Sequence, residues 1–194
     1  MIGLLLRKDY TPSLKEAYIM YESIVDMVYK YGMNVIGIVP SPIEKAKSII
    51  DICDGVILSG GSIESIYDKD IIKYIYDNDI PCLGICMGMQ EMGLLFNGKL
   101  KKINNHYNCN HDVLISDSKI LSNGIIKVNS RHHEILTKTN IKIVGKTTDN
   151  KIEMIEDSSK KFFVGVQWHP ENLNDEISNK IFDTFFEKIN KKSL

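Results

Sequence analysis

A cysteine held between two glycines, directly after a short apolar strand, is the feature that most constrains the fold of this chain. The segment reads P-C-L-G-I-C-M-G-M-Q over residues 81–90. Glycines two positions before and after Cys86 let the backbone turn sharply, because a Cβ would obstruct the turn. This is the layout of a nucleophile elbow, which lifts its side chain to the rim of a sheet at the start of a helix. The unpaired N–H groups and dipole of that helix favour a thiolate, so we predict a reactive cysteine instead of an inert, buried one.

A candidate base for this cysteine lies near the other end of the sequence, in F-F-V-G-V-Q-W-H-P-E at residues 162–171. His169 and Glu171 are two apart on an extended segment and therefore face the same side, and Pro170 keeps His169 extended. A histidine can take the proton of a thiol and return it to a leaving amine, while a carboxylate fixes its tautomer. An ordinary salt bridge is the alternative, but beside the elbow we favour a triad of Cys86, His169 and Glu171.

A glycine pair follows another apolar strand, in D-G-V-I-L-S-G-G at residues 54–61. Such a turn can expose backbone N–H groups, and two donors aimed at one point form an oxyanion hole. We assign one donor to Gly61 and the other to Met87. Taken alone, the glycine pair fits a plain strand-to-helix loop or a phosphate cradle equally well.

Hydrophobic periodicity around these motifs predicts an α/β fold. In the first half, strands at 2–6, 33–39, 55–59 and 82–85 are expected to alternate with helices at 14–31, 43–51, 70–78 and 87–96. This alternation predicts a mostly parallel central sheet with helices on both faces, which binds ligands beyond the carboxyl ends of its strands. Six shorter strands predict a smaller antiparallel extension before a final helix at 175–191; they are expected at 99–103, 112–115, 125–129, 141–147, 151–155 and 162–168.

Length and charge restrict the class of protein further. A chain of 194 residues is expected to form one domain, residues 1–194, with a substantial core. The net charge of −1 gives no field for nucleic acid or an anionic membrane. Four cysteines without paired spacing fit a reducing cytoplasm, and the apolar run at the N-terminus is too short for a signal peptide or membrane span.

The motifs D-G-V-I-L-S-G-G, L-G-I-C-M-G-M-Q, V-N-S-R-H-H-E and G-V-Q-W-H-P-E occur in this order along the chain. Together they resemble the class I glutamine amidotransferases, whose fold is a flavodoxin-like three-layer sandwich. The double histidine at 132–133 and Trp168 before His169 favour the stand-alone γ-glutamyl hydrolase branch, typified by γ-glutamyl-γ-aminobutyrate hydrolase, over synthetase-linked glutaminases. Glu134, where that branch usually has glutamine, departs from the pattern and leaves the substrate open.

This resemblance implies a cysteine-dependent hydrolase that cleaves a γ-glutamyl amide through a glutamyl thioester and releases L-glutamate and an amine, without a cofactor. The candidate substrates are small molecules: γ-glutamyl-γ-aminobutyrate, or a γ-glutamyl-CDP conjugate of capsule phosphoramidate synthesis, whose phosphates would meet Arg7 and Arg131. Two alternatives stay open. The chain is either a glutaminase subunit that passes ammonia to a separate synthetase, a protein partner the sequence leaves unknown, or a non-catalytic binding or redox-sensing module.

The resemblance also implies a glutamyl pocket, with Gly60, Gln90, Asn129, Ser130, Arg131, His132 and Arg7 as its expected residues. His106, Cys109 and His111 form a separate cluster that could be part of a metal site. A second group of ligands at the usual spacing is missing, so no metal is expected. A substrate-side or structural role is favoured for these three residues.

Overall fold

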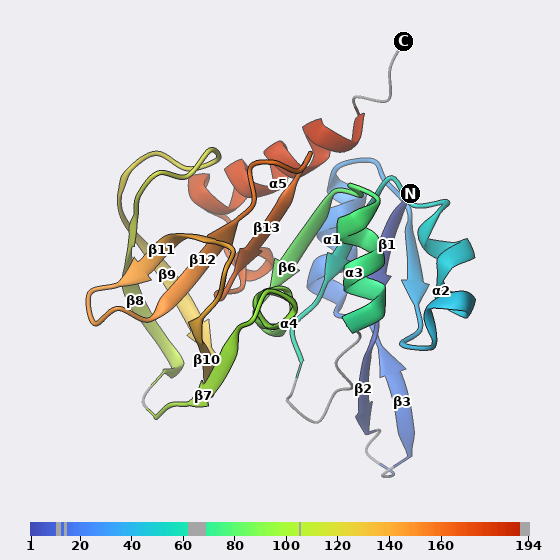
Figure 1. Cartoon of the computed structure of the whole chain (residues 1–194), viewed down its shortest axis with the longest axis horizontal. Coiled ribbons are helices and arrows are strands. Elements are labelled where there is room, and N and C mark those ends of the chain that lie inside the picture. The colour runs from blue at the N-terminus through green and yellow to red at the C-terminus, as the bar shows by residue number, and fades with distance from the viewer. Residues whose placement is uncertain (11–12, 14, 62–68, 105, 191–194) are drawn as a thin grey trace.

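The computed structural model describes residues 1–10, 13, 15–61, 69–104 and 106–190. Its centre is a nine-stranded sheet in the order β4-β1-β5-β6-β13-β12-β11-β8-β9 (Figure 1). The first five of these strands are mutually parallel: β4 (Val35–Ile38), β1 (Ile2–Leu5), β5 (Gly55–Leu58), β6 (Cys82–Ile85) and β13 (Phe163–Val166). The last four continue it antiparallel: β12 (Ile152–Glu156), β11 (Lys142–Thr147), β8 (Tyr107–Ile115) and β9 (Gly124–Arg131).

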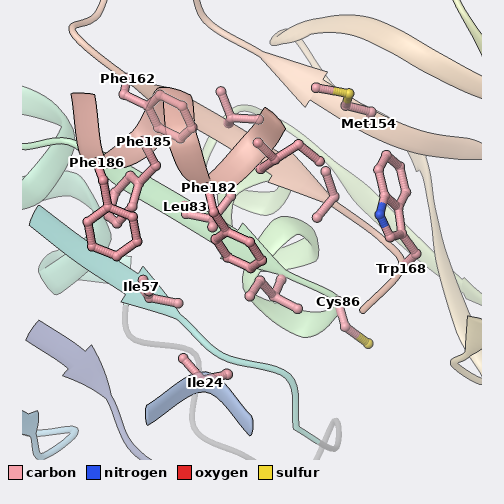
Figure 2. Packing of buried hydrophobic residues seen from close by; sticks show 14 of the residues in the cluster. Ile24, Ile57, Leu83, Cys86, Met154, Phe162, Trp168, Phe182, Phe185 and Phe186 are labelled. Carbon is pink, nitrogen blue, oxygen red and sulfur yellow. The ribbon is translucent and has the colours of Figure 1, made fainter. Parts of the chain in front are cut away.

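Helices cover both faces of the parallel half. Their bounds are α1 (Glu22–Lys30), α2 (Ile43–Ile50), α3 (Lys69–Asp77), α4 (Met87–Leu95) and α5 (Glu176–Asn190). Successive side chains of a strand point to opposite faces, and Leu4 accordingly packs in the core beneath α1 and α5 while Leu5 packs in the core beneath α2, α3 and α4. Figure 2 shows the first of these cores, in which three phenylalanines of α5 lie over the sheet. The predicted three-layer α/β fold is thus confirmed.

The structure differs from the sequence-based expectation in the segment predicted as a helix from residue 14. Its beginning, residue 14, lies outside the described residues, but β3 (Glu16–Ile19) pairs antiparallel with β2 (Arg7–Tyr10), and the helix α1 starts only at Glu22. Exposure alternates along β3 with the period of two that a strand requires. The predicted helix is therefore correct from Glu22 onward and wrong over Glu16–Ile19, which form a strand.

Further differences lie in the antiparallel half. The strand β8 begins at Tyr107, five residues earlier than expected, because its first residues pair with the end of β9. The strand β10 (Glu134–Lys138) was not expected; it pairs with β7 (Lys99–Lys102). The short 3₁₀ helix η1 (Pro170–Asn172) follows β13, so Glu171 lies in a helical turn and not on the extended segment that was expected. Among the described residues, no helix has both the length and the apolar character needed to cross a membrane.

The order of the strands brings the sequence motifs together. β6 lies between β5 and β13 and runs parallel to both, so all three end at the same edge of the sheet. Ser59 follows β5, Cys86 follows β6, and β13 leads through Trp168 to His169. The register pairs Ile85 with Val166, and the Cys86 N–H donates to the Val166 carbonyl at 2.8 Å.

Candidate active site

Cys86 occupies a strained turn between β6 and α4. Its φ of 52° and ψ of −107° are rare for any residue with a side chain. The two flanking glycines make this turn possible: a Cβ on Gly84 would lie 2.8 Å from the backbone of Gly88, and a Cβ on Gly88 would overlap the carbonyl oxygen of Leu58. Cys86 as a whole residue is only 6% exposed, and Figure 2 shows its sulfur at the margin of the core, directed away from the phenylalanines of α5.

His169 lies between Cys86 and Glu171. Its Nδ1 is 2.7 Å from Oε1 of Glu171, so an Nδ1–H donates to the carboxylate. Burial by itself would lower the pKa of His169, but hydrogen bonding to Cys86 and then to Glu171 outweighs burial and raises the pKa to about 10. The ring is therefore an imidazolium near neutral pH, placed to give a proton to a leaving group.

Asn129 and Gln167 fix the positions of the reacting side chains. Asn129 binds the backbone of His169 on both sides: its Oδ1 accepts from the His169 N–H at 2.8 Å and its Nδ2 donates to the His169 carbonyl at 2.9 Å. Nε2 of Gln167 lies 3.6 Å from the Cys86 sulfur, and Gln167 Oε1 accepts from Gln90 at 3.0 Å. Gln167 was not singled out from the sequence, although it is the residue that directly follows β13.

The turn after β5 lies against the same side chains. A Cβ on Gly60 would lie 3.0 Å from Cε1 of His169 and 3.6 Å from Cβ of Cys86, so only glycine leaves this approach open. Gly61 follows and is exposed. Met87 is the first residue of α4, so its N–H has no partner within the helix. Of the two proposed oxyanion donors, Met87 follows Cys86 in the chain, and Gly61 follows Gly60, which approaches His169 and Cys86.

Arg7 has a different environment from the expected substrate contact. It is 1% exposed and forms a bidentate ion pair with the buried Glu91 of α4, with N···O distances of 2.8 and 2.7 Å. Its Nε and Nη2 also donate to the Ser59 carbonyl. Arg7 therefore ties the turn at Ser59 to α4 and has no free face for phosphates, while Arg131 is exposed at the end of β9.

The other expected pocket residues are mostly engaged within the protein. Gln90 is buried and donates to the Glu134 carbonyl at 2.9 Å. Ser130 is buried and donates to the His106 carbonyl. His132 is buried, and its Nδ1 donates to the Glu134 carbonyl at 3.0 Å. These three side chains therefore bond to the protein backbone and stabilise the conformation of the site.

Comparison with known proteins identifies the class. The profile of the family described as glutamine amidotransferase class-I matches residues 14–189. A glutamine amidotransferase-like protein of Rickettsia prowazekii is 26% identical, over 71% of this chain and 77% of that protein. The glutamine-hydrolysing GMP synthase of Lactobacillus gasseri is 34% identical over 74% of this chain, but the match spans only 29% of the synthase.

Two solved structures share the fold. A GMP synthase subunit of Thermoplasma acidophilum superposes with a TM-score of 0.77 at 18% identity, covering 98% of this chain and 94% of that one. The glutaminase domain of a Trypanosoma brucei CTPS, with bound acivicin, gives 0.75 at 18% identity, covering 100% of this chain and 94% of that one. This chain belongs to the class I glutamine amidotransferase family. It is a hydrolase acting on an amide C–N bond.

Proposed function

We propose that this chain hydrolyses a γ-glutamyl amide through a glutamyl thioester on Cys86. The observation that carries the proposal lies at one edge of the sheet, where the imidazole of His169 is hydrogen-bonded to both the Cys86 thiol and the Glu171 carboxylate. These bonds raise the pKa of His169 to about 10. A cysteine at a helix N-terminus beside an imidazolium is the environment in which thiolates form. Acyl transfer also requires an oxyanion hole, and we assign one of its N–H donors to the neighbouring glycine turn.

The reaction follows from these positions. The Cys86 thiolate attacks the γ-carbonyl carbon, and the oxyanion that forms accepts hydrogen bonds from the N–H groups of Gly61 and Met87. The imidazolium of His169 gives its proton to the amine nitrogen as the C–N bond breaks. Neutral His169 then takes a proton from water, which attacks the thioester; glutamate leaves and the thiolate is restored. Glu171 holds Nδ1–H throughout, so Nε2 faces the reaction.

The Cys86→Ala variant tests the assignment of the nucleophile. It is expected to lose turnover by at least about a thousandfold, because no other group can form the thioester, while far-UV circular dichroism stays unchanged. Mass spectrometry of the wild-type chain mixed with γ-glutamyl amides is expected to show a glutamyl adduct that the variant lacks. Normal turnover by Cys86→Ala would refute the proposal.

The proposed reaction does not by itself specify which amine is joined to the γ-glutamyl group of the substrate. To identify this amine, turnover is measured separately with γ-glutamyl-γ-aminobutyrate, with a γ-glutamyl-CDP conjugate and with glutamine. The buried pairing of Arg7 with Glu91 removes one of the two cations expected for phosphates, so an effect of Arg131→Ala confined to the CDP conjugate would support that substrate. Equal effects on all three compounds would count against it.

A second candidate is a glutaminase that passes ammonia to a separate synthetase. It is favoured by the match to only 29% of a GMP synthase, since this chain then corresponds to part of a larger enzyme. Glutamine hydrolysis that stays slow for the isolated chain and rises when a synthetase partner is added would support it. Rapid turnover of another γ-glutamyl amide by the isolated chain would support the stand-alone hydrolase.

A further inference from the structure

A group of buried and half-buried histidines with a buried glutamate lies outside the triad, in the antiparallel half of the sheet. His106 precedes β8, His132 follows β9, and Glu153 is part of β12. One ligand atom of each of these residues lies within 4.8 Å of the others. His111 of β8 adjoins the group, with its Nε2 3.4 Å from Oε2 of Glu153. Four possible ligands, two within the strands β8 and β12 and two at the ends of β8 and β9, therefore lie close together.

Burial makes this arrangement costly as it stands. Glu153 is 0% exposed, and neither of its carboxylate oxygens has a hydrogen-bond partner among the described residues. The same holds for Nδ1 of His106, both ring nitrogens of His111 and Nε2 of His132. A buried carboxylate without a partner is strongly unfavourable, so a positive charge at the centre of the group would stabilise it.

The ring of His132 is held in one orientation by a backbone partner. Its Nδ1–H donates to the Glu134 carbonyl, which leaves the lone pair of Nε2 facing Glu153, 3.8 Å from Oε1. A metal-bound histidine usually donates one ring N–H to a carbonyl, carboxylate or water, which leaves the other nitrogen free for the metal; the bond from His132 to Glu134 is of this kind.

We infer that His106, His132 and Glu153, with His111 as the fourth ligand, bind a divalent transition metal, with zinc the best fit. Nitrogen and carboxylate ligands in a four-membered set suit tetrahedral zinc, whose ligand atoms lie about 3.4 Å apart at bond lengths of roughly 2.0–2.1 Å. The separations of 3.4 and 3.8 Å at Glu153 already approach this value. The sequence lacked a second ligand group beside His106 and His111; the fold supplies it from His132 and Glu153.

The position of the site indicates a structural role. β11 pairs with β8 only over Val113–Ile115, so His111 lies beyond the end of that pairing, where β8 has no ladder joining it to β11. A metal here would cross-link β8, β9 and β12 in place of the missing hydrogen bonds. The group also adjoins the catalytic edge, because the Glu134 carbonyl accepts from both His132 and Gln90, and the Gln167 N–H donates to the Glu153 carbonyl at 2.8 Å.

The test measures metal content and does not depend on activity. All proteins carry Cys86→Ala, which removes the thiol that would otherwise compete for zinc. After removal of metal by chelator and titration with Zn²⁺, elemental analysis is expected to show one zinc per chain, and Co²⁺ is expected to give the intense visible bands of a tetrahedral site. Thermal unfolding should shift upward with Zn²⁺ and not with Mg²⁺.

Two variants locate the site and one controls for it. Glu153→Gln keeps the side-chain volume, and it and His132→Ala are each expected to weaken zinc binding at least tenfold and to abolish the cobalt bands. His133→Ala removes the adjacent histidine, which is exposed and stacks on Tyr107, and is expected to keep both. If His132→Ala fails to fold, Glu153→Gln decides. No metal uptake by the parent protein, or equal uptake by Glu153→Gln, would overturn the inference.

Discussion

At the scale of single residues, backbone strain at Cys86 is the feature that separates this site from an ordinary strand end. A side chain at φ 52° and ψ −107° costs on the order of 1–3 kcal/mol, and the surrounding glycines hold it there. The turn presents the sulfur to His169 in return. Strain of this kind has a consequence for stability that can be measured without a substrate.

Replacement of Cys86 by glycine is expected to give a more stable protein than replacement by alanine. Glycine adopts positive φ without strain, and the gain of about 1–3 kcal/mol exceeds the roughly 0.4–1 kcal/mol that alanine gains by restricting the unfolded chain. Urea denaturation of Cys86→Gly and Cys86→Ala measures the difference directly. An equally stable pair would mean that the turn is not strained.

The raised pKa of His169 predicts a pH dependence of stability. Since the folded-state pKa of about 10 lies above the ordinary value of 6.5, this group's contribution is fully present below about pH 6.5 and is lost as the pH rises to about 10. The loss of unfolding free energy caused by His169→Gln is therefore expected to shrink across that range. In a Glu171→Gln background the pH dependence should be weaker, because one of the two partners that raise the pKa is gone; an unchanged slope there would contradict the role of Glu171.

At the scale of elements, the junction of β6 with α4 depends on close packing against β5. Gly88 lies against the backbone of Leu58, and this approach keeps the first turn of α4 directly above the strand ends. The pair of Arg7 with Glu91 holds the same helix from the side of β2. Both contacts place the N-terminus of α4, and therefore the Met87 N–H, beside Cys86.

Gly88→Ala is expected to lower stability by an amount at the upper end of about 1–3 kcal/mol, or more, because the new Cβ would overlap a backbone oxygen that cannot rotate away. Gly37→Ala is the matched control: its Cβ would meet only side-chain carbons of Leu6, at 3.1 Å or more, so a smaller loss is expected. Chemical denaturation compares the two. Equal losses would show that close approach to β5 is not what requires glycine at position 88.

At the scale of the whole molecule, the parallel half and the antiparallel half belong to one continuous sheet. Cys86 and His169 follow the neighbouring strands β6 and β13, and β13 is also the strand on which the antiparallel half begins. Trp168, the single tryptophan, is fully buried next to this junction. The catalytic edge therefore requires both halves to be folded.

This continuity predicts that the chain unfolds as one unit. Tryptophan fluorescence reports the junction and circular dichroism reports all helices, and the two are expected to give one coincident transition in urea. Phe185→Ala removes a buried ring of α5. It is expected to lower the free energy of unfolding by about 3–5 kcal/mol, by the same amount with either probe. Separate transitions would mean that the halves are distinct domains.

Much of this molecule was predictable because its signals are local. The elbow at Cys86 follows from two glycines and a strand. The pairing of His169 with Glu171 was expected from a spacing of two on an extended segment; the two side chains do meet, but through the first turn of the 3₁₀ helix η1. The β3 strand was predicted as helix because the helical spacing of α1 was extended toward the N-terminus, while the hairpin contact with β2 that decides its state is not encoded in its own residues. Glu153 carried a signal too, as a charge between the apolar residues Ile152 and Met154 of a buried strand.

The sequence by itself determined the layered α/β class, the elbow and the order in which the reactive groups follow their strands, since periodicity and glycine spacing act within a few residues. Only the tertiary structure decided that Arg7 turns inward to Glu91, that Gln167 reaches the thiol, and that His132 and Glu153 meet His106. These outcomes depend on which distant strands become neighbours, and buried polar groups then find their partners by proximity in space, where separation along the chain has no bearing.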